Sequence, residues 1–260
     1  MRRNRSFNAV FILLAFFLVL FIGVPIFLTL TGSPPRVFWQ AVLDEQVQES
    51  ILFTFFSSLI ATGVGLLTGI PLAYLLARKN FPGKQFIESL IDLPIVIPHS
   101  AAGIALLLAL GRGSALGRGF EALGLRFVSA APGVVAAMLF VSVPFLVDAA
   151  REGFEAVDPR LEYVARTLGS SAWNVFWRVS FPMAWRSIIS GLIMMWARGI
   201  SEFGAVVILT YHPMIAPVLL YERFQSFGLD YALPVAGIVI LISMLVFLIL
   251  RALNSNREDK

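Results

Sequence analysis

Long apolar runs separated by short polar segments make up most of this sequence. A bilayer core about 30 Å thick is crossed by a helix of about 20 mostly apolar residues, so each such run is a candidate span. The runs lie at residues 7–31, 51–77, 90–110, 131–150, 183–209 and 232–251. The pattern therefore predicts an all-α, polytopic membrane helical bundle of about six transmembrane helices, with residues 1–260 forming a single transmembrane domain.

The distribution of Lys and Arg predicts the orientation of these spans. With the start of the chain inside, the predicted cytoplasmic segments hold fourteen of these residues and the predicted outer loops hold five. Because basic residues favour the cytoplasmic side, we expect a multi-pass protein of the cell (cytoplasmic) membrane with both termini in the cytoplasm. The apolar stretch after Arg2, Arg3 and Arg5 exceeds the about 7–15 residues of a signal-peptide core, so we expect a retained first span. Residues 254–260 are expected to form a frayed polar tail.

Composition excludes several classes of site. The chain is 58% hydrophobic and 14% charged, with a mean hydropathy of +0.84, so its surface needs membrane lipid rather than water around it. It contains no Cys and two His, which excludes disulfides and thiol nucleophiles and leads us to expect no metal site. The net charge of +4 comes from short basic clusters beside apolar runs, a pattern that indicates membrane topology and no nucleic acid partner.

The cytoplasmic loop at residues 152–182 predicts two short helices. Asp158 is a natural N-cap, Pro159 suits the first helical position, and Gly169 can end the helix in the left-handed conformation. One apolar stripe at helical spacing runs along this helix and consists of Leu161, Val164, Ala165 and Leu168, while Arg160, Glu162 and Arg166 lie away from it. A second helix, capped by Ser170 or Ser171, carries another stripe made of Trp173, Phe176 and Trp177, before Pro182 opens the fifth span.

Two interpretations of these helices remain open on pattern alone. They could lie in the lipid headgroup layer, as basic and aromatic amphipathic helices often do. Alternatively, they form a helical knob that inserts into a groove on a soluble partner.

The longer spacing of this loop resembles the coupling loop of ABC-type importer permeases. That family's pattern is Glu-Ala-Ala, three residues, Gly, nine residues, Ile, one residue, then Leu-Pro. Ala165, Gly169 and Pro182 match it, Val179 and Phe181 are apolar substitutes, and Tyr163 and Val164 stand where the family has Glu and Ala. The resemblance implies that the loop docks in a cleft of a separate ATP-hydrolysing subunit. The residues expected at this contact are Asp158, Pro159, Leu161, Glu162, Tyr163, Ala165, Gly169 and Ser170, with Glu162 a candidate for the contact of the family's Glu.

A charged pair interrupts the predicted fifth span. Arg198 lies near its middle, where a lone charge costs about 2.5–3.5 kcal/mol on insertion scales, and Glu202 follows one helical turn later. The pair could neutralise itself inside the bundle, or Arg198 could line an anion path.

The predicted third span contains Pro94 and Pro98, which interrupt its backbone hydrogen bonds. Irregular backbone at membrane depth occurs where it is buried in protein or lines a wet cavity. The interruption could therefore be a kinked packing helix or part of a transport path. The candidate residues of such a path are His99, Ser100, Arg198, Ser201 and Glu202.

Four further stretches resemble the molybdate and tungstate branch of these permeases: Ile95 to Ser100, Arg198 to Ala205, Met214 to Pro217 and Tyr221 to Phe224. Sulfate permeases are close relatives of that branch. The resemblance implies an importer subunit for a tetrahedral oxyanion that works by alternating access. It implies a second copy of the chain, a pair of ABC ATPase subunits that hold ATP and Mg, and an external oxyanion-binding protein. No Gly-x-x-x-x-Gly-Lys-Ser/Thr motif is present, so we expect no cofactor on this chain.

Three alternatives stay open beside this interpretation. One is a permease for sulfate or another anion, and a second is an ion-driven transporter. The third is an intramembrane enzyme that uses Ser114 and His99, although no orienting carboxylate is evident from the sequence and the two lie at different predicted depths.

Overall fold

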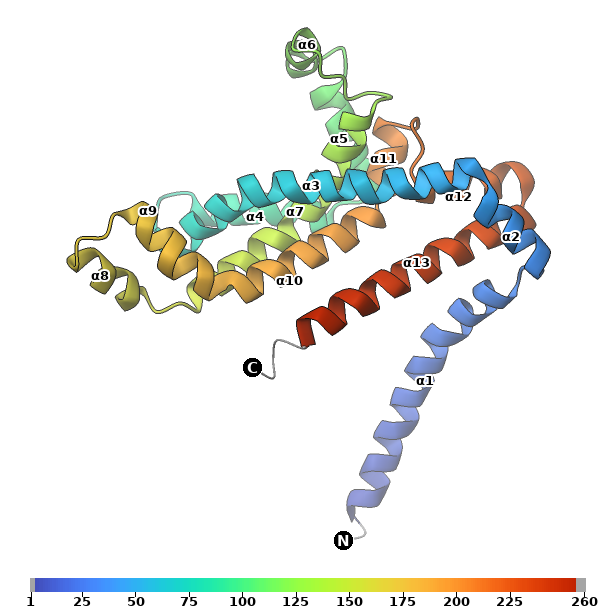
Figure 1. Ribbon diagram of the computed structural model, residues 1–260, viewed down its shortest axis with the longest axis horizontal. Coiled ribbons are helices and arrows are strands. Elements are labelled where there is room, and N and C mark those ends of the chain that lie inside the picture. The colour runs from blue at the N-terminus through green and yellow to red at the C-terminus, as the bar shows by residue number, and fades with distance from the viewer. Residues whose placement is uncertain (1–2, 256–260) are drawn as a thin grey trace. The chain divides into compact units, whose positions relative to one another are not determined.

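The computed structural model describes residues 3–255, with side chains described for residues 7–248 (Figure 1). Within residues 3–255, four helices are long and apolar enough to cross a membrane. They are α1 (Arg3–Thr31), α3 (Glu45–Arg78), α7 (Ala131–Glu155) and α13 (Leu229–Ser255). They cover four of the six predicted spans. The expected tail begins inside α13, and its residues 256–260 lie outside the described part of the chain.

The other two predicted spans are each broken into two helices. In the first, α4 (Lys84–Val96) and α5 (His99–Leu110) meet at 118°, and they make a fifth candidate span only if the bent pair counts as one. Ile97 is extended because the ring of Pro98 excludes helical geometry at the preceding residue. The predicted span at 90–110 is therefore a sharp bend and not one kinked helix.

The second break ends α10 (Phe181–Ile200) before α11 (Gly204–Leu209) begins. The backbone leaves the helix at Ser201, and the side chain of Glu202 then accepts a hydrogen bond from the N–H of Ala205 at 2.8 Å. This contact satisfies one of the free N–H groups at the start of α11, as an N-cap residue would. The apolar window at 183–209 therefore contains two helices, and Arg198 lies at the end of α10 rather than in mid-span.

Two compact units make up the chain. The first consists of residues 1–51 and 219–260, and in it α1 and α2 (Pro35–Leu43) pack against α13. Within this unit Asp44 caps α3 by accepting from the N–H of Gln46 at 2.9 Å, and it pairs with Arg223 of α12 (Ala216–Phe227) at 2.7 Å. These contacts fix the turn between α2 and α3.

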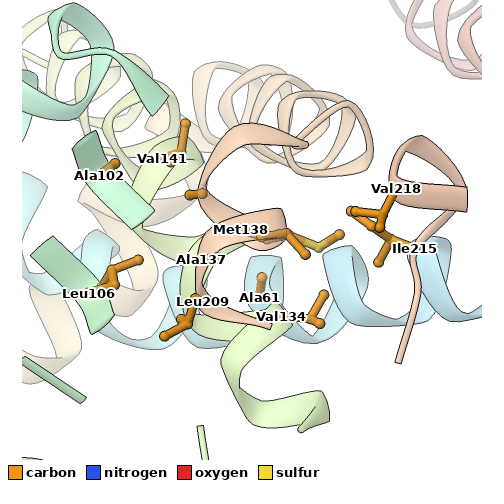
Figure 2. Packing of buried hydrophobic residues seen from close by; sticks show 12 residues of the cluster. Ala61, Ala102, Leu106, Val134, Ala137, Met138, Val141, Leu209, Ile215 and Val218 are labelled. Atoms are coloured by element: carbon orange, nitrogen blue, oxygen red, sulfur yellow. The ribbon is translucent and has the colours of Figure 1, made fainter. Parts of the chain in front are cut away.

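The second unit, residues 52–218, has α7 at its centre, packed along α10 and against α4, α5 and α11. One hydrophobic cluster joins α5, α7 and α11 and is shown in Figure 2, where Met138 and Ala137 of α7 lie between Leu209 and Val141. A second cluster joins α3, α7 and α10 around Leu76, Phe154 and Ile188. Between them, these clusters position both helix breaks and the loop that follows α7. The unit also contains the short helix α6 (Ala115–Ala122).

Candidate functional site

The two helix breaks lie against each other. His99 is the first residue of α5 and Gly204 is the first residue of α11, and these helices are in contact. A Cβ atom at Gly204 would lie 2.7 Å from the Cβ of His99 and 3.3 Å from the backbone N of Ser100. The absence of a side chain at Gly204 is therefore what allows α11 to start so close to α5.

A charged cluster occupies this junction. The carboxylate of Glu202 is fully buried, and its Oε2 lies 2.7 Å from Nδ1 of His99 and 2.8 Å from Nη2 of Arg198. The side chains of His99 and Arg198 are 37% and 21% exposed. Glu202 is thus the enclosed member of the cluster, and His99 and Arg198 are its accessible members.

Arg198 is a hydrogen-bond donor to both other members of the cluster. A guanidinium only donates, so Nη2 of Arg198 donates to Oε2 of Glu202 and to a ring nitrogen of His99. Nη2 lies 2.6 Å from Nδ1 and 2.9 Å from Nε2 of His99, and Nδ1 lies 2.7 Å from Oε2 of Glu202, so Arg198 donates to whichever ring nitrogen carries no proton. The acidic and basic charges therefore balance within the cluster, which makes its burial tolerable.

The other predicted path residues lie nearby. The hydroxyl of Ser201 donates to the backbone O of Arg198 at 3.0 Å and accepts from its Nη1 at 3.3 Å. Ser100 follows His99 on α5 and its side chain is exposed. The structure therefore brings together His99, Arg198, Ser201 and Glu202, and it leaves Ser100 at the edge of the cluster.

The first loop helix, α8 (Pro159–Thr167), forms where the sequence predicts it. Asp158 is its N-cap and accepts from the N–H of Arg160 at 2.9 Å, and Pro159 opens the helix. Gly169 adopts φ +89°, and the N–H of Ser170 bonds to the backbone O of Ala165 at 3.0 Å, which closes the C-terminus. Three side chains of the apolar stripe, those of Leu161, Val164 and Leu168, are exposed, as is Tyr163.

The second loop helix begins as predicted but does not end before the fifth span. Ser171, not Ser170, caps α9 (Ala172–Val175) by accepting from the N–H of Asn174 at 3.2 Å. α9 then continues through the π-helix η1 (Phe176–Ser180) into α10, so Pro182 does not start a separate span. The aromatic stripe lies along this junction, where Trp173, Phe176 and Trp177 contact one another. Phe176 and Trp177 also contact Phe181.

Glu162 points in the opposite direction from the exposed stripe and is buried. Its Oε1 lies 2.8 Å from Nε of Arg78 and accepts from the hydroxyl of Ser180 at 2.7 Å, and its Oε2 accepts from the hydroxyl of Tyr74 at 3.2 Å. Burial acts to raise the pKa of Glu162, but the hydrogen bonds from Ser180 and Arg78 and the positive charge of Arg78 outweigh it, so the pKa lies below its ordinary value. Glu162 is therefore an ionised carboxylate held inside the protein.

The partners of Glu162 escape sequence analysis. Arg78 ends α3 and lies 84 residues before Glu162, so no local spacing relates the two. The only sequence signal is a basic residue at the end of a predicted span, which membrane topology explains equally well.

Among the described residues, no group of three or more His, Asp or Glu side chains is placed to hold a metal ion.

Comparisons with known proteins agree with the arrangement of helices and loop. The family model of the binding-protein-dependent transport system inner membrane component matches residues 69–258. A molybdate/tungstate transport system permease protein of Pyrococcus furiosus is 46% identical over 237 residues, which cover 90% of each chain. A probable sulfate transport system permease protein of Chlorokybus atmophyticus is 34% identical over 211 residues, which cover 80% of this chain and 74% of that relative.

A solved structure of similar fold comes from a bacterial alginate ABC transporter in complex with an alginate pentasaccharide-bound periplasmic protein. One of its chains superposes with a TM-score of 0.75 at 16% identity, covering 96% of this chain and 93% of that chain. The superposition shows a shared fold, but at this low identity it does not identify the substrate. The family match and the extent of the identity settle the assignment: the chain belongs to the binding-protein-dependent transport system inner membrane components, the permease subunits of ABC-type importers.

Proposed function

We propose that this chain is the membrane-spanning permease subunit of an ATP-driven importer for a tetrahedral oxyanion, and that the oxyanion is molybdate or tungstate. The observation that carries the proposal is the 46% identity, over nine tenths of both chains, to a molybdate/tungstate permease. Sulfate is the second candidate, because a probable sulfate permease is 34% identical over 80% of the chain.

The geometry of the helix breaks supports an anionic substrate. Arg198, a permanent cation, lies beside the N-terminus of α5, where backbone N–H groups have no partner within the helix. Both features attract an oxyanion, and Arg198 and His99 are accessible while the competing carboxylate is enclosed. The proposed path residues are His99, Arg198, Ser201 and Glu202, with Ser100 beside them.

The proposal includes the assembly around the chain. One permease domain pairs with a second copy of itself, two ATPase subunits bind ATP and Mg on the cytoplasmic side, and an external binding protein delivers the oxyanion. Both termini are cytoplasmic, and transport proceeds by alternating access. The exposed stripe of α8 supports the docking role of the loop, since apolar side chains at helical spacing fit a groove on a partner.

Reconstitution tests the substrate and the energy source together. Proteoliposomes that contain the permease, its ATPase and its binding protein are expected to accumulate tungstate or molybdate only with ATP inside, and sulfate much more slowly. Faster uptake of sulfate would assign the chain to sulfate. Uptake without ATP, driven by an ion gradient, would contradict the importer mechanism.

Cross-linking tests the docking role of α8. The chain has no Cys, so single cysteines are unambiguous probes. Cysteines at Ala165 and Leu168 are expected to cross-link to the ATPase in a nucleotide-sensitive way, whereas Leu123→Cys is the matched control, since Leu123 is 77% exposed and Leu168 is 82% exposed. A cross-link from Leu123, or none from Ala165 and Leu168, would contradict docking through this loop.

A further inference from the structure

Helix α8 has an unusual attachment to the rest of its unit. Glu162 is its one buried residue, whereas Leu161, Val164 and Leu168 are exposed. Most helices are held by the burial of an apolar face. In α8 the apolar face is exposed, and the side chain that is buried against the rest of the unit is a carboxylate.

That carboxylate joins three elements. It receives Arg78 and Tyr74 from the end of α3 and Ser180 from the end of η1, where α10 begins. Arg78 makes a second contact, donating from Nη2 to the backbone O of Val157 at 2.9 Å, just before α8. Arg78, at the end of α3, therefore binds the loop at two places, the side chain of Glu162 and the backbone of Val157.

The physical character of this contact favours a positional role over a purely stabilising one. A buried ion pair contributes little net stability compared with well-packed apolar side chains, because both charges lose their hydration. Its geometry is specific, however, since the three donors to the Glu162 carboxylate restrict the position of α8 relative to α3 and η1. The depressed pKa of Glu162 keeps the charge present at neutral pH.

We propose that Glu162 is a latch that ties the docking helix α8 to α3 and α10, so that a displacement of the loop by the ATPase moves both spans. Glu162 is a positioning residue in this mechanism, and Arg78 is its principal partner. The proposal rests on the docking role of the loop proposed above. The two faces of α8 then have different roles. The exposed stripe contacts the ATPase, and Glu162 on the buried face connects the movement of α8 to α3 and α10.

The reconstituted complex tests the latch through the ratio of oxyanion transported to ATP hydrolysed. Glu162→Gln removes the charge and keeps the shape of the side chain. We expect the variant to assemble and hydrolyse ATP while this ratio falls by about fivefold or more, the lower end of typical coupling between distant sites. Glu49→Gln, at an exposed position of α3 outside the loop at residues 152–182, is the control and is expected to leave the ratio unchanged.

A second variant separates the latch from simple folding. Glu162→Met with Arg78→Met removes both charges and leaves no buried ion unpaired, so it is expected to restore thermal stability and assembly but not the ratio. If either folded variant transports normally per ATP, or if transport and hydrolysis fall in parallel, the latch is overturned. Absence of ATP-driven uptake by the unmodified chain would instead refute the proposed function.

Discussion

Arg198→Met isolates the role of the charged cluster at the helix breaks. The substitution keeps a long side chain but leaves Glu202, which is fully buried, without its cationic partner at 2.8 Å. Loss of one partner of a buried ion pair costs about 3–5 kcal/mol. Because His99 and the N–H of Ala205 still bond to Glu202, we expect a loss of about 3 kcal/mol, the lower end of that range.

A double-mutant cycle checks this magnitude. Glu202→Gln is expected to cost about 1.5–3 kcal/mol, since Arg198 is partly exposed and keeps Ser201 as an acceptor. The double variant is expected to lose less than the sum of the two single variants, by about 1–3 kcal/mol. Unfolding in mixed micelles, followed by tryptophan fluorescence, measures the three losses of stability, and Trp196, one of five Trp residues, lies in α10 two residues before Arg198.

Transport distinguishes an anion path from a structural pair. Arg198→Met is expected to abolish oxyanion uptake even in the assembled complex, and the double variant is expected to regain stability without uptake. Arg112→Met, in an exposed loop, is the matched control. Additive losses of stability would refute the ion-pair argument, and normal uptake by assembled Arg198→Met would refute the anion path.

Three other predictions follow from local geometry. Gly204→Ala is expected to cost about 1–3 kcal/mol and to lower uptake, because the new Cβ would displace the start of α5, and thermal unfolding with an uptake assay measures both effects. Asp158→Ala removes the N-cap of α8 and is expected to cost about 1 kcal/mol, which hydrogen exchange of the first turn would detect as faster exchange. The pKa of Glu162 in the folded protein lies below its ordinary value of 4.5, so its stabilisation is present above that value and is lost as the pH falls through the lower folded value. The difference in thermal stability between the unmodified chain and Glu162→Gln should therefore be constant from about pH 8 to pH 5 and should disappear in stronger acid, and a difference that changes between pH 8 and pH 5 would contradict the assignment.

Local signals in the sequence predicted α8 closely. Asp158, Pro159 and Gly169 act within a few residues of themselves, so their capping and turn roles depend little on the rest of the fold. The long apolar runs were equally informative, since a membrane restricts such runs to helices. These features gave the all-α membrane fold and four of its long helices.

Features that depend on distant contacts were not predictable. The apolar window at 183–209 hides the break at Ser201, beside which Glu202 bonds to His99, 103 residues earlier in the chain. Glu162 was assigned to the face away from the apolar stripe, but its burial depends on Arg78 and Ser180, which the sequence does not relate to it. Pro98 indicated an interruption, whereas the angle of 118° follows from packing of α5 on α11.

The enclosed carboxylate of Glu202 has a kinetic consequence. A dianion that reaches Arg198 meets a guanidinium whose charge is already balanced by Glu202 at 2.8 Å. On the proposed anion path, any contact that the dianion makes with Arg198 would compete with that carboxylate, which would shorten its residence there. A transport path needs sites that a substrate can leave as readily as it enters. Glu202 would thus weaken the binding of the oxyanion to Arg198 and allow the oxyanion to dissociate quickly.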